Sequence, residues 1–256
     1  MTAFTFGAAI FDLDGVVTDT ASVHADAWKS LFDDYLRACA ARLGTPFRPF
    51  DAGTDYVRYV DGKPRYEGVR SFLAARGLEL GAGDPSDSAD RETVCGLGNR
   101  KDRLFAAILE RDGVRAFEGT VSLIRQLREL GVPRAIASSS KNCRSVLERA
   151  GLVDLFDARV DGTVSAELGL PGKPAPDIFL ACAERLGVPP ARCVVVEDAV
   201  VGVEAGRAGG FGLVIGMDRT GNGEALRCHG ADVVVSDFRG VGPADVDRWY
   251  RRGRGT

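Results

Sequence analysis

The sequence predicts an α/β protein with a doubly wound (Rossmann-like) parallel sheet and a helical domain inserted after the first strand. Short apolar runs, several of them rich in Val and Ile, alternate with helical patterns along most of the chain. This alternation stops between about residues 22 and 116, where helical stretches follow one another with no apolar run between them. We therefore assign residues 1–21 and 117–256 to the α/β core and residues 22–116 to the inserted helical domain.

Five apolar runs have the length and composition of buried parallel strands. These runs are Ala8–Phe11, Arg134–Ala137, Cys193–Val196, Gly212–Ile215 and Asp232–Val235. The helices expected in the core are Val121–Leu130, Asn142–Ala150, Asp177–Leu186 and Val201–Ala208. The inserted segment is expected to form helices at His24–Ala41, Glu67–Arg76 and Arg100–Arg111, separated by Gly-, Pro- and Asp-rich loops at residues 44–53 and 81–90.

Composition excludes several classes of protein. The hydrophobic share of 45% is that of a chain that can bury a sizeable core, which argues against disorder. The formal net charge of -3 shows no basic excess, so nothing indicates a nucleic-acid partner. No run approaches the ~18 apolar residues of a membrane helix. We expect a protein without a membrane span that acts as a monomer.

The N-terminal residues and the cysteines indicate a cytoplasmic location. The first basic residue is Lys29, so a secretory signal with a basic start is not expected. None of the six cysteines forms a CxxC pair, and a chain of 256 residues does not need disulfide bonds to fold. With only two histidines, a zinc site would need an unusual ligand set.

The first strand ends in a pair of carboxylates. Asp12 and Asp14 leave the strand on the same side, and Gly15 allows a sharp turn through which the backbone can approach a ligand. In open α/β sheets, ligands bind beyond the carboxyl ends of the strands, where this pair lies. A helix-capping residue followed by a turn residue would give the same pattern, so the pair alone leaves both interpretations open.

Two further strand ends carry polar groups. A turn of hydroxyl and amide residues, Ser138-Ser139-Ser140-Lys141-Asn142, follows the second strand and opens a helix, where backbone N–H groups can bind an anion. The alternative is a plain serine N-cap.

The adjacent acids Glu197 and Asp198 follow the strand Cys193–Val196, and a hard cation such as Mg²⁺ would relieve their repulsion. The alternative for this pair is helix capping.

A single lysine lies in the segment between these strands. Lys173 lies between Gly172, which allows a sharp turn, and Pro174, which restricts the backbone, so its positive charge would be held in place. An ordinary solvated loop lysine is the alternative.

Together, the four features resemble the motifs of the haloacid dehalogenase superfamily, and most closely its β-phosphoglucomutase-like subfamily. The matching segments read FDLDGVVTDT, SSSKN, KPAPD and EDAVVG, with a histidine and AWK following the first. The resemblance covers nearly the whole chain and implies that the insert is the mobile cap of this family. The long loops at residues 44–55 and 81–92 depart from the shortest family members.

The resemblance implies a role for each core motif. Asp12 would be the nucleophile that forms an aspartyl phosphate, and Asp14 the general acid/base. Mg²⁺ would bind the Asp12 carboxylate, the Asp14 carbonyl and Asp198, with Glu197 binding directly or through water. Ser138 and Lys173 would hold the transferring phosphoryl oxygens.

The resemblance also implies a site for a sugar phosphate. Ser140, Lys141 and Asn142 match the site of the distal phosphate, and Arg65 matches the cap arginine that completes it. Thr20, His24 and Lys101 match cap positions that orient the sugar, while Gly15 and Ser139 are expected to contact the substrate through their turns. For His24, Arg65 and Lys101, ordinary surface or helix-start roles are the alternatives.

The activity implied is interconversion of β-D-glucose 1-phosphate and glucose 6-phosphate through an aspartyl phosphate and glucose 1,6-bisphosphate. The main alternative is a sugar-phosphate phosphatase that uses the same nucleophile with water as acceptor. A two-component receiver domain is disfavoured because its acidic pair follows its first strand, whereas Glu197-Asp198 comes last here. A dehalogenase would need neither Asp14 nor a metal-binding acidic pair.

Overall fold

The computed structural model describes residues 4–253 and divides the chain into two compact units. The core unit comprises the chain up to Asp19 and from Val114 onward, and the cap unit comprises Thr20–Gly113. The cap thus begins two residues and ends three residues earlier than the boundaries 22 and 116 expected from sequence. Residues after Val114 belong to the core because the Asp19 N–H donates to the Arg115 carbonyl (2.8 Å) and the Phe117 N–H to the Val17 carbonyl (2.9 Å).

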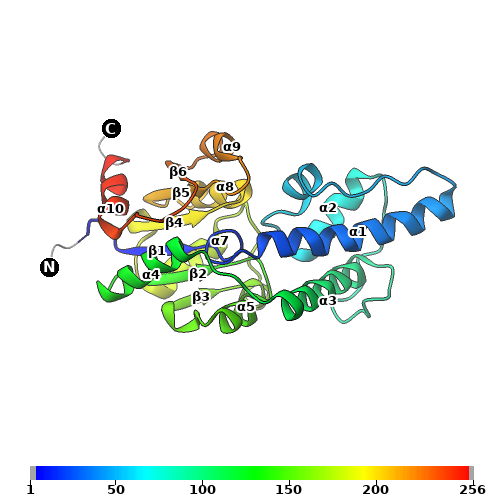
Figure 1. Cartoon of the computed structure of the whole chain (residues 1–256), viewed down its shortest axis with the longest axis horizontal. Coiled ribbons are helices and arrows are strands. Elements are labelled where there is room, and N and C mark those ends of the chain that lie inside the picture. The colour runs from blue at the N-terminus through cyan, green and yellow to red at the C-terminus, as the bar shows by residue number, and fades with distance from the viewer. Residues whose placement is uncertain (1–3, 254–256) are drawn as a thin grey trace. The chain divides into compact units, whose positions relative to one another are not determined.

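Six parallel strands form one sheet in the described part of the core unit, in the order β3-β2-β1-β4-β5-β6 (Figure 1). The strands are β1 Ala8–Phe11, β2 Arg134–Ala137, β3 Ala158–Val160, β4 Cys193–Glu197, β5 Leu213–Met217 and β6 Val233–Val235. Sequence reasoning missed β3, which has only three residues, two of them partly exposed at the edge of the sheet. The doubly wound fold that the alternation predicted is confirmed.

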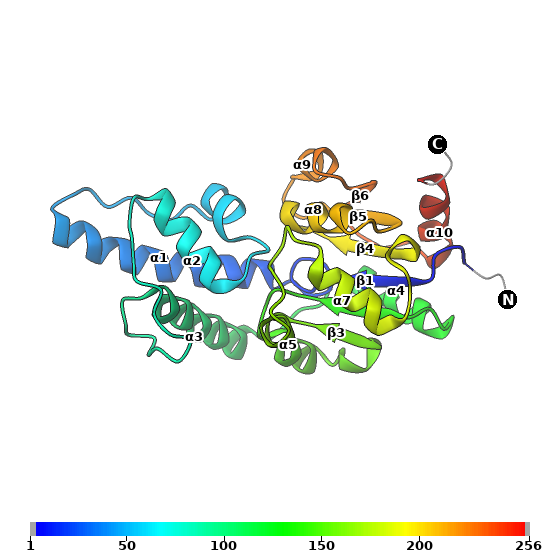
Figure 2. The ribbon, with the colours of Figure 1, turned by 180° about the vertical axis from the view of Figure 1, so that it is seen from behind.

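Helices cover both faces of the sheet. They are α4 Glu118–Glu129, α5 Cys143–Ala150, α6 Gly162–Glu167, α7 Asp177–Leu186, α8 Val200–Ala208, α9 Gly223–Cys228 and α10 Pro243–Arg252, with 3₁₀ turns at Val153–Leu155 and Pro190–Arg192. Figures 1 and 2, which view the chain from opposite sides, show α4 on one face and α7 on the other. Alanine, valine and isoleucine side chains of β1, β2 and β4 are fully buried beneath α7 and α8.

The strand order places a topological switch point at β1. Ile10 of β1 lies opposite Ala135 of β2 on one side and Val195 of β4 on the other. The chain winds outward in opposite directions from β1 and β4, so loops leave the sheet on opposite faces and open a crevice beyond the carboxyl ends of these two strands. The acidic motifs lie at the carboxyl ends of β1 and β4.

The cap unit packs its helices around an aromatic core. Its helices are α1 Ala21–Leu43, a π-helical turn at Tyr56–Val60, α2 Arg65–Ala75 and α3 Val94–Asp112. Phe72 lies 4.1 Å from Phe32 and 5.0 Å from Phe50 between ring centroids, and all three rings are buried. Helix α3 begins six residues before the expected position because the Thr93 side chain accepts a hydrogen bond from the Gly96 N–H and caps it. None of the helices described in either unit has the length and hydropathy of a membrane span.

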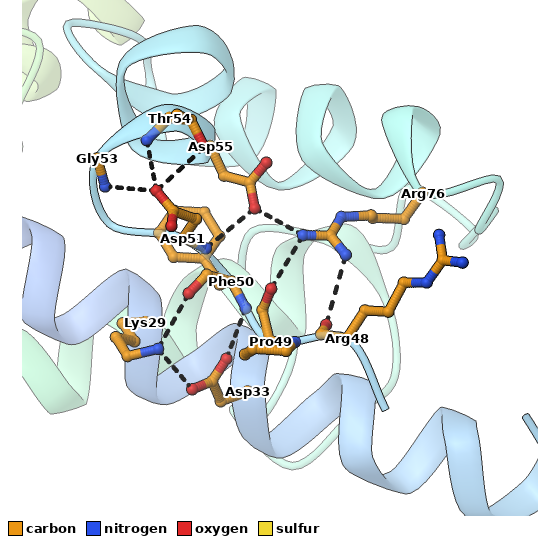
Figure 3. A network of polar contacts seen from close by, with 10 residues as sticks. All are labelled: Lys29, Asp33, Arg48, Pro49, Phe50, Asp51, Gly53, Thr54, Asp55 and Arg76. Atoms are coloured by element: carbon orange, nitrogen blue, oxygen red, sulfur yellow. Dashed lines mark hydrogen bonds and ion pairs between the residues drawn. The ribbon is translucent and has the colours of Figure 1, made fainter. Parts of the chain in front are cut away.

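Polar contacts hold the long loop before the π-helical turn (Figure 3). The buried carboxylate of Asp33 accepts hydrogen bonds from the Phe50 N–H (2.7 Å) and from the Lys29 ammonium (2.9 Å), which also donates to the Phe50 carbonyl. Arg76 bonds the Pro49 carbonyl and the Asp55 carboxylate. These contacts fix Phe50 in the aromatic core although the loop carries no regular structure there.

Replacing Asp33 should therefore destabilise the cap. Asp33→Ala leaves the buried Phe50 N–H without its acceptor, which typically costs about 1–3 kcal/mol. Urea unfolding in a Trp249→Phe background, where Trp28 on α1 is the remaining tryptophan, measures this loss. The neighbouring Asp34→Ala is the control, because the Asp34–Arg37 pair is exposed and should contribute little. Equal unfolding midpoints for both variants would contradict the assigned role of Asp33.

Candidate active site

Asp12 is held at the switch point by the sheet itself. Its N–H donates to the Val196 carbonyl of β4 (2.9 Å), which extends the β1–β4 ladder by one residue and fixes the start of the Asp12 side chain. The carboxylate is almost fully buried. Burial raises the pKa of Asp12 well above its usual value, the charge of Lys173 opposes this, and Glu197 and Asp14 add to the rise.

Lys173 is buried between two carboxylates. Its ammonium lies 2.6 Å from Asp12 Oδ1 and 2.5 Å from Glu197 Oε1, and 4.9 Å from the centroid of the Phe179 ring. Burial alone would lower the pKa of Lys173, but Asp12 and Glu197 together raise it above its usual value. The ammonium therefore stays charged, and the interpretation of Lys173 as a solvated loop residue is wrong.

Asp12, Glu197 and Asp198 form an acidic cluster. One carboxylate oxygen from each lies within 4.8 Å of the others. Three carboxylates face one ammonium, so the cluster keeps an excess of negative charge, and carboxylate oxygens are the ligands that hard divalent cations prefer. The donor set therefore fits a divalent metal ion.

Glycines allow the acidic turns to approach one another. Gly15 has φ +84°, and a Cβ atom there would lie 1.8 Å from Asp198 Oδ2, so a larger residue would displace the Asp198 carboxylate. A Cβ atom at Gly202 of α8 would likewise lie 1.8 Å from Glu197 Oε1. Glu197 is further oriented by the Ala199 N–H, which donates to its Oε2 (2.7 Å). The turn after β1 and the start of α8 are thus packed directly on the acids of this cluster.

The turn after β2 lies beside Asp14. The buried Ser138 hydroxyl donates to Asp14 Oδ2 at the long distance of 3.5 Å and accepts from the Ser140 N–H (3.1 Å). Ser140 Oγ in turn accepts from the Asn142 N–H (3.1 Å). Gly162 packs against this turn, since a Cβ atom there would lie 2.5 Å from the Ser139 carbonyl oxygen. A simple serine N-cap does not describe the motif, because Asn142 occupies the N-cap position of α5.

Four of the predicted residues, Thr20, His24, Arg65 and Lys101, belong to the cap unit. The buried ammonium of Lys101 contacts His24 Nδ1 and lies 4.7 Å from the centroid of the Phe105 ring. His24 stacks on the same ring at 4.0 Å between centroids. Lys101 and His24 are therefore brought together from helices α3 and α1, and neither is an ordinary surface residue.

Thr20 and Arg65 lie at helix starts. Thr20 occupies the N-cap position of α1, where its carbonyl accepts from the His24 N–H (2.9 Å). Arg65 begins α2 and pairs with Asp102 of α3 at 2.9 Å.

Sequence reasoning assigned no role to the polar turn Asp218–Asn222 that follows β5. In the structure, Arg219 Nε donates to the Gly15 carbonyl (2.8 Å) and Asn222 Nδ2 to the Asp198 carbonyl (3.3 Å). The rule that polar strand ends gather at one edge of the sheet could have drawn attention to this turn. The identity of its partners could not be predicted, because the Arg219–Gly15 contact joins residues 204 positions apart.

Comparison with known proteins places this site in a family. Residues 6–210 match the model of the haloacid dehalogenase-like hydrolase family. The chain is 50% identical over 234 residues to a β-phosphoglucomutase of Mycobacterium bovis, covering 90% of this chain and 89% of the relative. It is 32% identical over 233 residues to a phosphorylated carbohydrates phosphatase of Thermotoga maritima, covering 89% and 93%.

A solved structure agrees with these relatives. The crystal structure of a β-phosphoglucomutase from Clostridium difficile matches with a TM-score of 0.75 and 27% identity, covering 96% of this chain and 98% of that one. The chain belongs to the haloacid dehalogenase-like hydrolase family. Within it, the chain is an enzyme of the β-phosphoglucomutase-like subfamily, as its motifs predicted.

Removing the buried ammonium should destabilise the core unit. Lys173→Met leaves Asp12 and Glu197 buried without their cation, and breaking a buried pair in this way costs about 3–5 kcal/mol. Because a divalent cation would replace part of the lost positive charge and binds only the folded protein, Mg²⁺ should restore part of the stability. Chemical unfolding with and without Mg²⁺ measures both effects, with the exposed Arg144→Ala as control. Wild-type stability in Lys173→Met would contradict this account.

Proposed function

We propose that this enzyme is a Mg²⁺-dependent phosphomutase that interconverts β-D-glucose 1-phosphate and glucose 6-phosphate. The observation that carries the proposal is the buried Asp12 carboxylate, held by Lys173 and clustered with Glu197 and Asp198 at the switch point of the sheet. The β-phosphoglucomutase relative with 50% identity supports this choice of substrate. The core unit, up to Asp19 and from Val114 onward, would supply the chemistry, and the cap unit, Thr20–Gly113, the recognition of the sugar.

Asp12 would be the nucleophile and Asp14 the general acid/base. Starting from the aspartyl phosphate, the C6 hydroxyl of β-D-glucose 1-phosphate would attack the phosphorus atom, the bond from phosphorus to Asp12 would break, and the hydroxyl proton would pass to Asp14. After the resulting glucose 1,6-bisphosphate reorients, an Asp12 oxygen would attack the phosphorus on C1, the bond from phosphorus to the C1 oxygen would break, and that oxygen would take the proton back from Asp14. Glucose 6-phosphate would leave, and the aspartyl phosphate would be restored for the next cycle.

The phosphoryl group carries negative charge throughout the transfer, and cations must offset it. Lys173 and the Ser138 hydroxyl would contact its oxygens, which their positions beside Asp12 and Asp14 support. Asp12, Asp198 and the Asp14 carbonyl would hold Mg²⁺, with Glu197 beside them. When bound, the ion would neutralise charge on the transferring group.

Substrate recognition would involve both units. In the core, Ser139, Ser140, Lys141 and Asn142 would bind the distal phosphate, and the Gly15 turn would contact the transferring one. In the cap, Arg65 would add a positive charge for the distal phosphate, while Thr20, His24 and Lys101 would orient the sugar. The contact of Lys101 with His24 over Phe105 supports a shared role for these two residues.

A sugar-phosphate phosphatase is the second candidate. The Thermotoga maritima relative, whose name describes a phosphatase of phosphorylated carbohydrates, favours it. The same aspartyl phosphate would form, and water would replace the sugar hydroxyl as acceptor. The two activities differ in whether water is excluded while the sugar bisphosphate reorients.

One assay separates the two candidates. Purified enzyme with Mg²⁺, β-glucose 1-phosphate and a trace of β-glucose 1,6-bisphosphate is followed by phosphorus NMR. Glucose 6-phosphate as the main product supports the mutase, and inorganic phosphate supports the phosphatase. Asp12→Asn is the control and should show neither product, because the covalent path is lost. Near-normal turnover by this variant would overturn the assignment of the nucleophile.

Arg65 should matter only for substrates with a distal phosphate. Arg65→Ala should raise KM for glucose 1-phosphate and lower kcat/KM by the equivalent of about 2–5 kcal/mol, the typical cost of losing one partner of a desolvated charge pair. Acetyl phosphate hydrolysis should change little, because this substrate has no second phosphate. Arg70→Ala, at an exposed position on the same helix, is the matched control. Unchanged glucose 1-phosphate kinetics in Arg65→Ala would show that Arg65 does not bind the distal phosphate.

A further inference from the structure

The turn between β5 and α9, residues 218–222, contacts both acidic turns of the site. Arg219 Nε donates to the Gly15 carbonyl at 2.8 Å, one residue after Asp14. Asn222 Nδ2 donates to the carbonyl of Asp198 at 3.3 Å. One short segment therefore bonds the backbones of the two turns that carry Asp12, Asp14 and Asp198.

The Arg219 side chain is fixed by groups other than Gly15. Its Nη1 donates to the Ser236 carbonyl (2.8 Å) and lies 3.9 Å from Asp237 Oδ2. The guanidinium carbon lies 3.6 Å from the centroid of the Phe117 ring. Phe117 is itself bonded to the carbonyl of Val17, so Arg219 touches the turn after β1 directly through Gly15 and indirectly through Phe117.

Hydrogen bonds fix the segment that carries Arg219 to the sheet and close it on itself. The Asp218 N–H donates to the Val235 carbonyl of β6 (2.8 Å), which anchors the turn to the sheet. Asp218 Oδ1 accepts hydrogen bonds from the N–H groups of Gly221 (2.7 Å) and Asn222 (2.9 Å). A turn closed in this way can act as a fixed support for the acidic turns that it contacts.

Two buried polar atoms of this turn have no hydrogen-bond partner among the described residues. They are Arg219 Nη2, a donor, and Asn222 Oδ1, an acceptor. Such atoms are costly, and in native proteins each calls for an explanation. Burial lowers the pKa of Arg219, while the carboxylates of Asp237 and Asp198 oppose the effect, and a guanidinium stays protonated in proteins. The molecule thus retains a half-buried charge with an unpaired donor next to the acidic turns.

The spacing of the acidic turns depends on the Gly15 backbone. Gly15 packs so closely on Asp198 that any Cβ atom would overlap with Oδ2. A shift of the Gly15 carbonyl therefore changes the position available to the Asp198 carboxylate, and with it the separation from Asp12. Metal ions bind through carboxylates held by such outer contacts, and loss of one outer contact typically costs 10–100-fold in affinity.

We propose that Arg219 is a positioning residue that holds the Asp12–Gly15 turn at the distance from Asp198 that a divalent ion requires. Asn222, from the same 218–222 segment as Arg219, contributes by donating a hydrogen bond to the Asp198 carbonyl. This inference rests on the proposed function, in which Asp12 and Asp198 share a metal ion, and adds to it a residue that touches neither metal nor substrate.

Isothermal titration of the full chain with Mg²⁺ alone tests the proposal. Arg219→Ala should weaken Mg²⁺ binding about 10- to 100-fold relative to the wild type. At saturating Mg²⁺, kcat should fall while KM for glucose 1-phosphate stays within about threefold, since the residue acts through the acidic turns. Millimolar guanidinium should restore part of the Mg²⁺ affinity by occupying the space of the lost side chain. Arg239→Ala is the matched control, because Arg239 pairs with Asp237 but contacts neither acidic turn, and it should bind Mg²⁺ like the wild type.

The outcomes distinguish this inference from the proposed function. A wild-type chain that binds no Mg²⁺ would overturn the metal in the proposed function, and this inference with it. A wild-type chain that binds Mg²⁺ and an Arg219→Ala variant that binds within twofold of it would overturn this inference alone. If Arg219→Ala does not fold, Arg219→Met, which keeps the length of the side chain but has no donor, decides the question. Mg²⁺ binding by Arg219→Met at least about tenfold weaker than by the wild type supports the proposal, and binding within twofold of the wild type overturns it.

Discussion

The ammonium of Lys173, buried against the carboxylates of Asp12 and Glu197, is the interaction on which the organisation of the core depends. β1 and β4 are adjacent in the sheet and both end in acids, so their register brings like charges together in a region of low dielectric. Without an internal cation, the carboxylates of Asp12 and Glu197 would repel each other at this edge of the sheet. Lys173 comes from a third segment and therefore also fixes the approach of the chain between β3 and β4.

The same electrostatic constraint provides a basis for phosphoryl-transfer chemistry. A site that must neutralise clustered carboxylates is also suited to neutralise a phosphoryl group, because both need fixed positive charge in a dry environment. Lys173 offsets only part of the negative charge of Asp12, Glu197 and Asp198, and the remaining charge is what makes the cluster a fitting ligand set for a divalent cation. Fold stability and the proposed catalysis thus draw on the same groups.

Close approach of the acidic turns also requires particular backbone positions. Gly15 and Gly202 have no Cβ atom where one would collide with Asp198 and Glu197. Around them, main-chain groups of β4 and of Ala199 bond Asp12 and Glu197, and the side chains of Arg219 and Asn222 bond the carbonyls of Gly15 and Asp198. The reactive side chains are therefore positioned by backbone contacts together with two side chains of the turn at residues 218–222.

The sequence by itself determined the class of fold and the chemistry at the ends of the strands. Buried parallel strands are continuous apolar runs, and the polar residues that end them are adjacent in sequence, so Asp12, Ser138 and Glu197 could be recognised locally. Their assigned roles remain predictions. Tertiary structure alone decided what local patterns do not encode: that β3 completes the sheet, that Lys173 is buried and that Arg219 reaches Gly15. The physical reason is that burial and long-range pairing arise only when segments far apart in the chain pack together.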